Sequence, residues 1–346
     1  MGLPFRDLVT SQEVPWEELA GRSVAVDGYN ALYQFLATIR QSDGRLFTDT
    51  EGRVTSHLVG LLYRTTSLLA EGVRPVWVFD GAPPALKAGT LSSRFRVKEK
   101  AEADWKEALA AGDMVTARRK AAATSRLSRE MVEEARRLLT ALGVPSLQAP
   151  SEGEAQAAFM AAKGQVWASA SEDYDGLLFG APRLVRGLSA RPRKGERTAA
   201  QVIDREKLLS ALGVNGDELI LIGILVGTDY NDGAPGYGPK RALKLAQEHL
   251  GWEASLRKAG LEVASVEPVA ELFRRPAVEE VPTPVFGVPD EEAVRRLLVD
   301  GHGFSDDRVA AAVHRAQKVR PSAPSASATP KGRQASLDGF GTEERS

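Results

Sequence analysis

Cysteine is absent from this chain of 346 residues, and histidine occurs only four times. Without cysteine, disulfide bridges and thiolate zinc sites are excluded. No two of the histidines (His57, His249, His302 and His314) have the close spacing of a zinc-binding helix motif. The chemistry of the protein must therefore rest on other side chains.

The chain also lacks long apolar runs and a large net charge. Its longest apolar stretch, residues 219–226, is too short to cross a bilayer and predicts a buried helix. Residues 1–7 lack the basic start and apolar run of a signal peptide. We expect an intracellular, soluble protein without a membrane partner. Because the net charge is −1, nucleic-acid binding can be argued only from where the charges lie.

Short β-rich runs alternate with helical patterns in the first two hundred or so residues. Residues 23–27 and 76–80 each end in an acid, and residues 166–171 are followed at once by two more. Apolar residues recur at helical spacing in 58–69 and in 127–142, before a glycine. This order predicts an α/β fold with a mostly parallel central sheet that is flanked by helices on both faces.

Seven acids stand where such a sheet would gather ligands. They follow the expected strands, open the helix before the third strand, or follow the apolar stretch. They are Asp27, Asp80, Glu152, Glu154, Asp173, Asp175 and Asp229. Ligands of open parallel sheets bind outside the carboxyl ends of the strands. We therefore expect these side chains to converge.

A single acid at such a place also has a structural explanation. Asp204 and Asp217 stand just before apolar helical runs, as capping residues do. Ser151 and Glu154 have the spacing of a capping box, which explains Glu154 equally well. A cluster is different, because like charges about 4 Å apart repel by roughly 4 kcal/mol at an effective dielectric near 20. Hard divalent cations compensate such repulsion, since Mg²⁺ and Mn²⁺ prefer carboxylate oxygens.

Metal-assisted hydrolysis needs no nucleophilic side chain. The sequence has no Gly-x-Ser-x-Gly elbow and no Walker A loop, since Pro239 breaks the pattern of residues 233–240. Two metal ions roughly 3.5–4 Å apart would activate water and stabilise the leaving oxygen of a phosphodiester. Residues 236–241 open an apolar helix with glycines and basic residues, a pattern that suits a phosphate and also an ordinary turn.

The segment 87–129 is the basic part of an otherwise balanced chain. It holds eleven basic and five acidic residues, a net charge of +6, and has little apolar stripe. Such a segment is also compatible with a solvated helical excursion from the core. Farther along, residues 321–330 have the proline, serine and alanine composition of a disordered linker.

Several segments together resemble the flap endonucleases, which are structure-specific 5′ nucleases of replication and repair. The segments are Asp27 with 33–36 (YQFL), 79–87 (FDGAPPALK), 151–156 (SEGEAQ), 171–179 (SEDYDGLLF) and 227–231 (GTDYN). They occur in the family's order and spacing between Met1 and about Lys318. The resemblance implies that all seven acids hold two Mg²⁺ ions, with Mn²⁺ as a substitute.

The resemblance also implies roles for residues near the cut. Lys87 and Arg94 match basic residues at the foot of the family's helical arch, here 88–130, which neutralise the scissile phosphate. Tyr33 matches an aromatic that stacks on a base, although an isolated tyrosine after a strand is more often a core residue. Gly2 matches a small residue that lets the N-terminus lie close to the active site.

Two further elements of the family have counterparts here. Residues 227–250, with Gly236, Gly238, Lys240 and Arg241, look like a helix-hairpin-helix that binds duplex DNA, in the family often with a K⁺ ion. In the tail, Gln334, Leu337 and Phe340 resemble the peptide that binds a sliding clamp of the PCNA type. Gly341 replaces the second aromatic of that peptide, and chance hydrophobic residues in a frayed tail are the alternative.

We therefore predict a monomeric, Mg²⁺-dependent 5′ flap endonuclease with 5′–3′ exonuclease activity on DNA. Its parts are a nuclease domain (1–320), a disordered linker (321–333), the clamp-binding peptide (334–341) and a tail (342–346). One rival is a sister 5′ nuclease with mainly exonuclease, gap or junction activity, which would share all the acids. The other is a non-catalytic DNA-binding adaptor at the clamp, which would need broken metal ligands, and none of the seven is broken.

Overall fold

One mixed sheet forms the centre of the computed structural model, which describes residues 5–188 and 199–317. The strands are β1 (Gln12–Pro15), β2 (Ser23–Asp27), β3 (Arg74–Phe79), β4 (Ser146–Gln148), β5 (Ala168–Ala170), β6 (Arg183–Arg186) and β7 (Ala199–Asp204). Their order is β1-β7-β6-β5-β2-β3-β4. From β6 to β4 all neighbours are parallel, whereas β7 pairs antiparallel with β6 and β1. The expected α/β fold with a mostly parallel sheet is confirmed, and an antiparallel edge is added.

Helices account for most of the remaining chain. The α-helices are α1 (Gly28–Thr38), α2 (Ser56–Ala70), α3 (Ala88–Ala110), α4 (Met114–Ala121), α5 (Arg129–Ala141), α6 (Gly153–Ala162), α7 (Asp175–Leu178), α8 (Arg205–Leu212), α9 (Gly216–Val226), α10 (Pro239–Ala246), α11 (Trp252–Lys258), α12 (Val263–Arg274), α13 (Glu291–Arg295) and α14 (Asp306–Gln317). Short 3₁₀ turns are η1 (Phe5–Asp7), η2 (Trp16–Leu19), η3 (Ala85–Lys87) and η4 (Ala122–Thr124), and η5 (Arg296–Asp300) is a π-helical turn.

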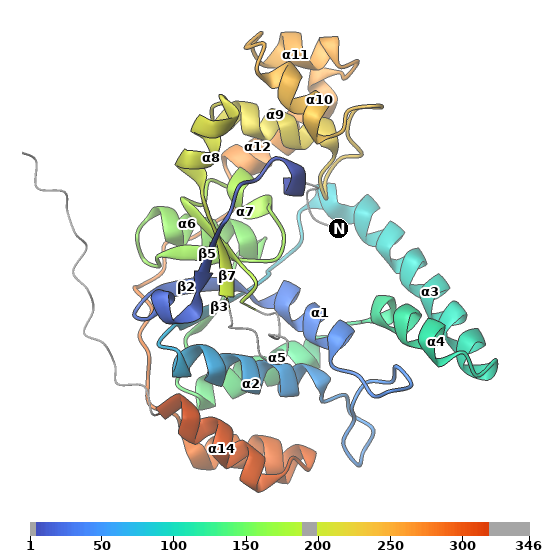
Figure 1. Cartoon of the computed structure of the whole chain (residues 1–346), viewed down its shortest axis with the longest axis vertical. Coiled ribbons are helices and arrows are strands. Elements are labelled where there is room, and N and C mark those ends of the chain that lie inside the picture. Colours follow the sequence, from blue (N-terminus) through green and yellow to red (C-terminus); the bar gives the residue numbers. More distant parts are fainter. Residues whose placement is uncertain (1–4, 189–198, 318–346) are drawn as a thin grey trace, which may run out of the picture.

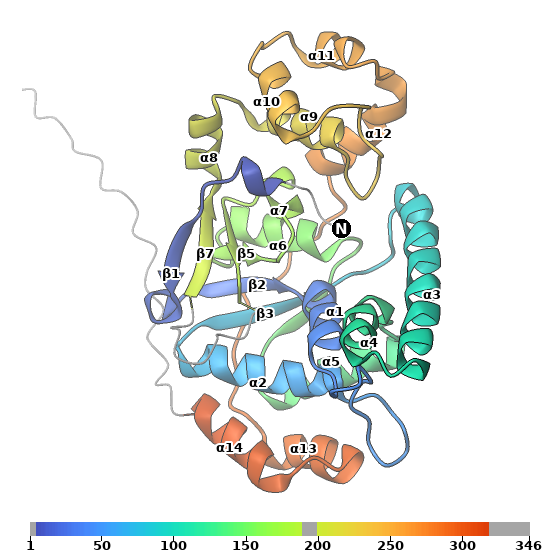
Figure 2. The same cartoon turned by 45° about the vertical axis from the view of Figure 1, so that its right-hand side comes forward.

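Helices cover the sheet on both faces, and its central strands are therefore buried on both (Figures 1 and 2). Successive side chains of β3 point to opposite faces. Trp77 and Phe79 join a core with α1, α2 and α5, whereas Val76 and Val78 pack with Met160 of α6. This double burial holds the carboxyl ends of β2, β3 and β5 side by side.

The basic segment after β3 extends away from the sheet as α3 and α4 (Figure 1). The two helices are joined by an ion pair between Lys120 Nζ and Asp104, at 2.6 Å. Trp105 Nε1 of α3 donates a hydrogen bond to the Asp43 carbonyl oxygen at 3.3 Å. Gly44, at φ +87°, lies so close to α4 that an added Cβ would come within 2.7 Å of Ala121 Cβ. The segment is therefore docked on the loop that follows α1.

Helices α8 to α12 pack around a second core at one end of the molecule (Figure 2). The predicted buried helix is α9, which begins with a capping box between Asn215 and Glu218. Asp204 caps α8 as expected. Asp217 does not cap α9, because Asn215 takes that place; its carboxylate binds Arg274 instead, at 2.9 Å. No single helix in the described ranges is long and apolar enough to span a membrane, and only the bent pair α8 and α9 passes jointly, by length and composition.

The opposite end carries a cluster of buried histidines and carboxylates. His302, after η5, has Nδ1 2.9 Å from Asp49 Oδ2 and Nε2 3.4 Å from Glu134 Oε1. His57 Nε2 of α2 lies 3.3 Å from the other oxygen of Glu134, which belongs to α5. Arg53 donates to Asp49 at 2.7 Å. The cluster, defined here as the histidine cluster, fastens the C-terminal helices to α2 and α5.

Candidate active site

Two acids stand at the ends of neighbouring parallel strands. Asp27 is the last residue of β2, in register with Val78 of β3, and Asp80 follows β3 directly. Asp27 Oδ1 accepts a hydrogen bond from the Asn30 backbone N–H at 3.0 Å and so caps α1. Asp80 Oδ1 accepts one from the Gly153 N–H at 2.7 Å. Backbone donors therefore orient both carboxylates.

The start of α6 supplies two more acids. The capping box that was the alternative explanation of Glu154 does not form: the N-cap is Glu152, and the Ser151 hydroxyl donates to the Ala82 carbonyl oxygen at 3.0 Å. Glu154 therefore does not act as the second residue of a capping box. Its Oε1 atom is buried and has no hydrogen-bond partner in the part of the chain that the structure describes. The position of Glu154 is therefore not explained by helix capping. Its carboxylate instead faces other acids.

Asp173 and Asp175 follow β5, the parallel neighbour of β2 on its other side. Asp173 Oδ2 accepts a hydrogen bond from Asn30 Nδ2 at 2.8 Å, so one residue of α1 contacts acids from two strands. Asp175 is buried at the start of α7.

Asp229 reaches the same place from the turn after α9. Lys87 Nζ lies 2.7 Å from Glu152 Oε2 and 3.9 Å from Asp229 Oδ2. The same ammonium lies 5.9 Å from the centre of the Tyr230 ring. Lys87 therefore ties the end of the molecule formed by α8 to α12 to the edge of the sheet.

The electrostatics show that these carboxylates act on one another. Burial raises the pKa of Asp27, and the charges of Asp80 and Asp173 raise it further. Burial and Glu152 raise the pKa of Asp80 to about 6. Burial, followed by Asp175, Asp27 and Asp173, raises the pKa of Glu154. These three acids thus resist ionisation because they are buried and because their neighbours are acids.

Lys87 supplies positive charge beside these acids. Burial alone would lower the pKa of its ammonium, but Glu152, Asp80 and Asp229 outweigh burial and raise it. As the side chains stand, no three His, Asp or Glu residues of the described ranges are arranged so that they could hold a metal ion. The donor set is nevertheless that of a hard divalent cation, because it consists of mutually repelling carboxylates and includes the partnerless Glu154 oxygen.

The basic and aromatic candidates lie on α1 and α3. Tyr33 is half-buried on α1, and Lys98 Nζ of α3 lies 4.4 Å from the centre of its ring. This contact places Tyr33 between the body and the projecting helix rather than in the core. Arg94 lies on α3, but its side chain is outside the described part of the structure.

Residues 227–250 hold the glycine-containing turn that follows α9 and then α10, so the first helix of the predicted helix-hairpin-helix lies before these bounds. Gly236 has φ +77°, and Gly238 is the N-cap of α10, which opens with Pro239. Lys240 and Arg241 are exposed, and Arg241 stacks on Tyr237 at 4.4 Å. The turn therefore presents a helix N-terminus together with basic side chains, the arrangement that suits a phosphate.

Comparison with known proteins identifies this architecture. Residues 6–101 match the XPG N-terminal domain and residues 143–229 match the XPG I-region. The flap endonuclease 1 of Staphylothermus marinus is 44% identical over 333 residues, covering 92% of this chain and 95% of that protein. That of Methanothrix thermoacetophila is 48% identical over 322 residues, covering 91% and 95%. The chain belongs to the flap endonuclease family.

A solved flap endonuclease has the same fold. The flap endonuclease-1 structure from Methanococcus jannaschii matches with a TM-score of 0.72 at 40% identity, covering 91% of this chain and 98% of that one. The family resemblance drawn from the sequence motifs is thus confirmed. Gly2 and the tail residues Gln334, Leu337 and Phe340 lie outside the described residues, so their roles stay predictions.

Sequence reasoning missed two residues of this flap endonuclease site. Asn30 was not singled out, because its hydrogen bond to Asp173 spans 143 positions. Its place three residues after Asp27 was the available signal, since an N-cap carboxylate accepts from that backbone N–H. Tyr230 belongs to a quoted motif but was given no role; burial and the nearby acids, Glu152 first, raise the pKa of its hydroxyl.

Proposed function

We propose that this structure-specific 5′ nuclease hydrolyses the DNA phosphodiester where a 5′ flap leaves the duplex, with Mg²⁺ as its cofactor. The observation that carries the proposal is the meeting of acids from β2, β3, β5, α6 and the turn after α9. Burial and mutual repulsion raise the pKa of Asp27, Asp80 and Glu154. A marginally stable fold tolerates such repulsion when it serves a site.

Seven carboxylates would hold two Mg²⁺ ions or Mn²⁺ in their place. They are Asp27, Asp80, Glu152, Glu154, Asp173, Asp175 and Asp229. Such ions lower the pKa of bound water and neutralise charge on a phosphate.

The chain's own residues prepare that chemistry. The Asn30 side chain and the Gly153 N–H fix the carboxylates of Asp173 and Asp80. Lys87, held by Glu152, offers its ammonium to a phosphate oxygen, and Arg94 lies on the helix that follows. A substrate phosphate would compete with Glu152 for Lys87 and leave that carboxylate to a cation.

Duplex DNA would bind at the helix-hairpin-helix without reading sequence. The N-terminus of α10 and the exposed Lys240 and Arg241 favour phosphate contacts. Gly236 and Gly238 let backbone approach the DNA closely, and a K⁺ ion would sit at this turn as the family resemblance implies.

Selection of free 5′ ends would come from the basic arch, residues 88–130. A single strand passing beneath α3 and α4 meets Tyr33 as a stacking platform. The enzyme would act as a monomer, and Gln334, Leu337 and Phe340 would tether it to a sliding clamp of the PCNA type.

A 5′-labelled flap substrate tests this function. We expect one cut near the junction in Mg²⁺ or Mn²⁺, none in EDTA, and binding that falls steeply with added salt because its contacts are to phosphates. Parallel reactions on nicked, gapped and four-way DNA separate a flap endonuclease from a sister nuclease. Flap binding without cutting in Mg²⁺ would instead identify a non-catalytic adaptor and overturn the proposal.

A further inference from the structure

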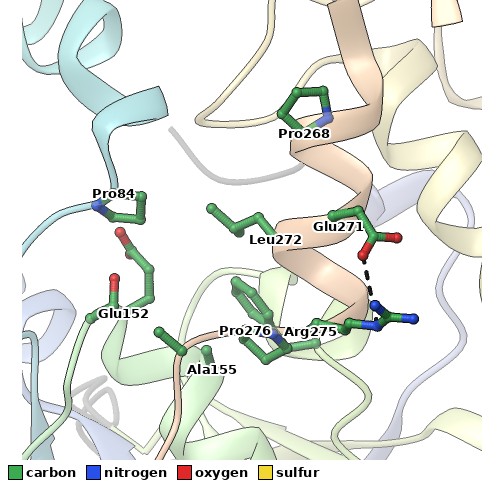
Figure 3. A pocket seen from close by; sticks show the side chains of 11 residues that line it. Pro84, Glu152, Ala155, Pro268, Glu271, Leu272, Arg275 and Pro276 are labelled. Atoms are coloured by element: carbon green, nitrogen blue, oxygen red, sulfur yellow. Dashed lines mark ion pairs between the residues drawn. The ribbon is translucent and has the colours of Figure 1, made fainter. Parts of the chain in front are cut away.

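The seven carboxylates of the candidate active site are called the acidic cluster below. A cavity of about 430 Å³ adjoins this cluster at Glu152. It lies between the start of α6, the segment that leads from Asp80 to α3, and the end of α12 (Figure 3). Its walls are mainly apolar and include Pro84, Ala155, Leu272 and Pro276. Figure 3 shows Leu272 reaching from α12 toward Pro84 and Glu152.

Three of the residues that line this mainly apolar space carry a charge: Glu152, Glu271 and Arg275. Glu152 belongs at once to the cavity and to the acidic cluster, where Lys87 Nζ lies 2.7 Å from its Oε2 atom. Arg275, the residue that follows α12, is 84% exposed and has Nε 3.8 Å from Glu271 Oε2. An exposed pair of this kind is worth little, so a phosphate can replace the glutamate as partner of Arg275.

We propose that this cavity holds one base of the unpaired 5′ strand, just beyond the cut, with an adjacent phosphate at Arg275. The inference rests on the proposed function and names a site for the flap. Its volume lies in the range of pockets that enclose a small ligand. Apolar walls suit the faces of a nucleobase, and Arg275 suits the charge that accompanies it.

The position of the cavity selects the unpaired strand. Bases within a duplex are stacked, so only an unpaired base can offer its faces to protein side chains. Pro84 belongs to the segment that leads into the arch, so the cavity borders the segment from which the arch begins. In this proposal the unpaired strand leaves the carboxylates beside this segment and places one base in the cavity.

An abasic scan of the flap tests the assignment. Binding is measured with Ca²⁺ in place of Mg²⁺, on DNAs that lack one base at successive flap positions. We expect wild-type affinity to fall about five-fold or more at one position, as the loss of a stacked base predicts. Leu272→Trp, which fills the cavity, should abolish this dependence and leave binding to flapless nicked duplex unchanged. Ala277→Trp, at an exposed position of the wall, repeats the test if Leu272→Trp does not fold.

The role of Arg275 is tested by a substitution that has a matched control. Arg275→Ala should weaken flap binding and reduce its logarithmic salt slope by about 0.7, the value for one single-strand phosphate contact. Arg257→Ala should do neither, although Arg257 is likewise exposed and paired with a glutamate four residues earlier, Glu253.

Two results would overturn the cavity assignment. One is a wild-type scan with no position dependence, and the other is a dependence that persists in both cavity-filling variants. Cleavage in Mg²⁺ is recorded on the intact flap in parallel. An enzyme that cuts flaps but gives a flat scan contradicts only the cavity, which then serves another occupant, whereas failure to cut contradicts the proposed function itself.

Discussion

The acidic cluster and the histidine cluster bury carboxylates in opposite ways. In the histidine cluster, burial would raise the pKa of Asp49, but hydrogen bonds from His302 and Arg53 outweigh it and lower the pKa to about 2. In the acidic cluster, burial and Glu152 raise the pKa of Asp80 to about 6. Asp49 accepts hydrogen bonds from a histidine and an arginine, whereas Asp80 faces other carboxylates.

The difference separates a structural role from a functional one. Hydrogen-bond donors around a buried acid stabilise its ionised form, and such contacts fasten the elements that carry them together. Buried acids that face each other cost stability, and such a cost is typical of sites that bind cations. The same side-chain type thus fastens the fold at one end of the molecule and, in the function that we propose, carries the chemistry at the sheet edge.

The largest effect is expected from Asp80→Asn. Cleavage should fall about a thousand-fold or more, since residues of one catalytic unit fail together. Stability in EDTA should stay equal or rise by about 1–3 kcal/mol, because the variant removes repulsion. Flap cleavage and urea unfolding measure the two quantities. Asp307→Asn, at an exposed acid of α14, is the control and should change neither. A marked loss of metal-free stability would make Asp80 structural.

A smaller effect on the same cluster is expected from Asn30→Ala. Asp173 would lose the side-chain donor that lies 2.8 Å away, so its carboxylate would be less well oriented. We expect Mn²⁺ affinity, measured by calorimetry, to weaken about ten-fold or more, as for other residues that orient a metal ligand. Thr38→Ala on the same helix removes only a hydroxyl bonded to the Gln34 carbonyl oxygen and should leave the affinity unchanged. Equal affinities in Asn30→Ala and wild type would contradict a positioning role.

A substitution in the histidine cluster should lower the free energy of unfolding and leave flap cleavage unchanged. Glu134→Ala removes the carboxylate shared by His57 and His302 and should cost about 1–3 kcal/mol, because buried polar groups lose a partner. The neighbouring Glu133→Ala breaks an exposed pair with Arg129 and should change stability by less than about 0.5 kcal/mol. Urea unfolding compares the two, and flap cleavage well below the melting temperature should be normal in both. Similar stabilities would show that the histidine cluster fastens nothing.

The smallest effect is a difference in pH dependence. Asp80 has a folded-state pKa of about 6 against an ordinary 3.8, so the folded protein binds that proton more tightly than the unfolded chain. Stability in EDTA should therefore fall as pH rises through this window. Asp49, with its pKa lowered to about 2, contributes stability above 3.8 that is lost only as pH falls through about 2. Urea midpoints at pH 5 and pH 7 should thus differ less in Asp80→Asn than in wild type. Equal pH dependence in both proteins would contradict the raised pKa.

Much of the site was predictable because its parts are local. The acid that ends β2 and the acid that follows β3 stand at strand ends that β-rich runs already mark. The spacing at Ser151 and Glu154 allowed a capping box as an alternative, but the chain forms a capping box at Asn215 and Glu218 and none at Ser151. Spacing shows which residues can form a cap, whereas the approach of Ser151 to the Ala82 carbonyl decides against it.

The sequence by itself determined the alternation of strands and helices, the acids that end or follow strands, and the family to which the motifs point. Only the tertiary structure decided that Asn30 bonds to Asp173, that Lys87 lies between Glu152 and Asp229, and that a cavity adjoins Glu152. The physical reason is the separation along the chain of the residues that make contact. Local patterns follow from the geometry of adjacent residues, whereas these contacts exist because β5, β2 and β3 lie parallel in one sheet and α9 and α12 pack against its edge.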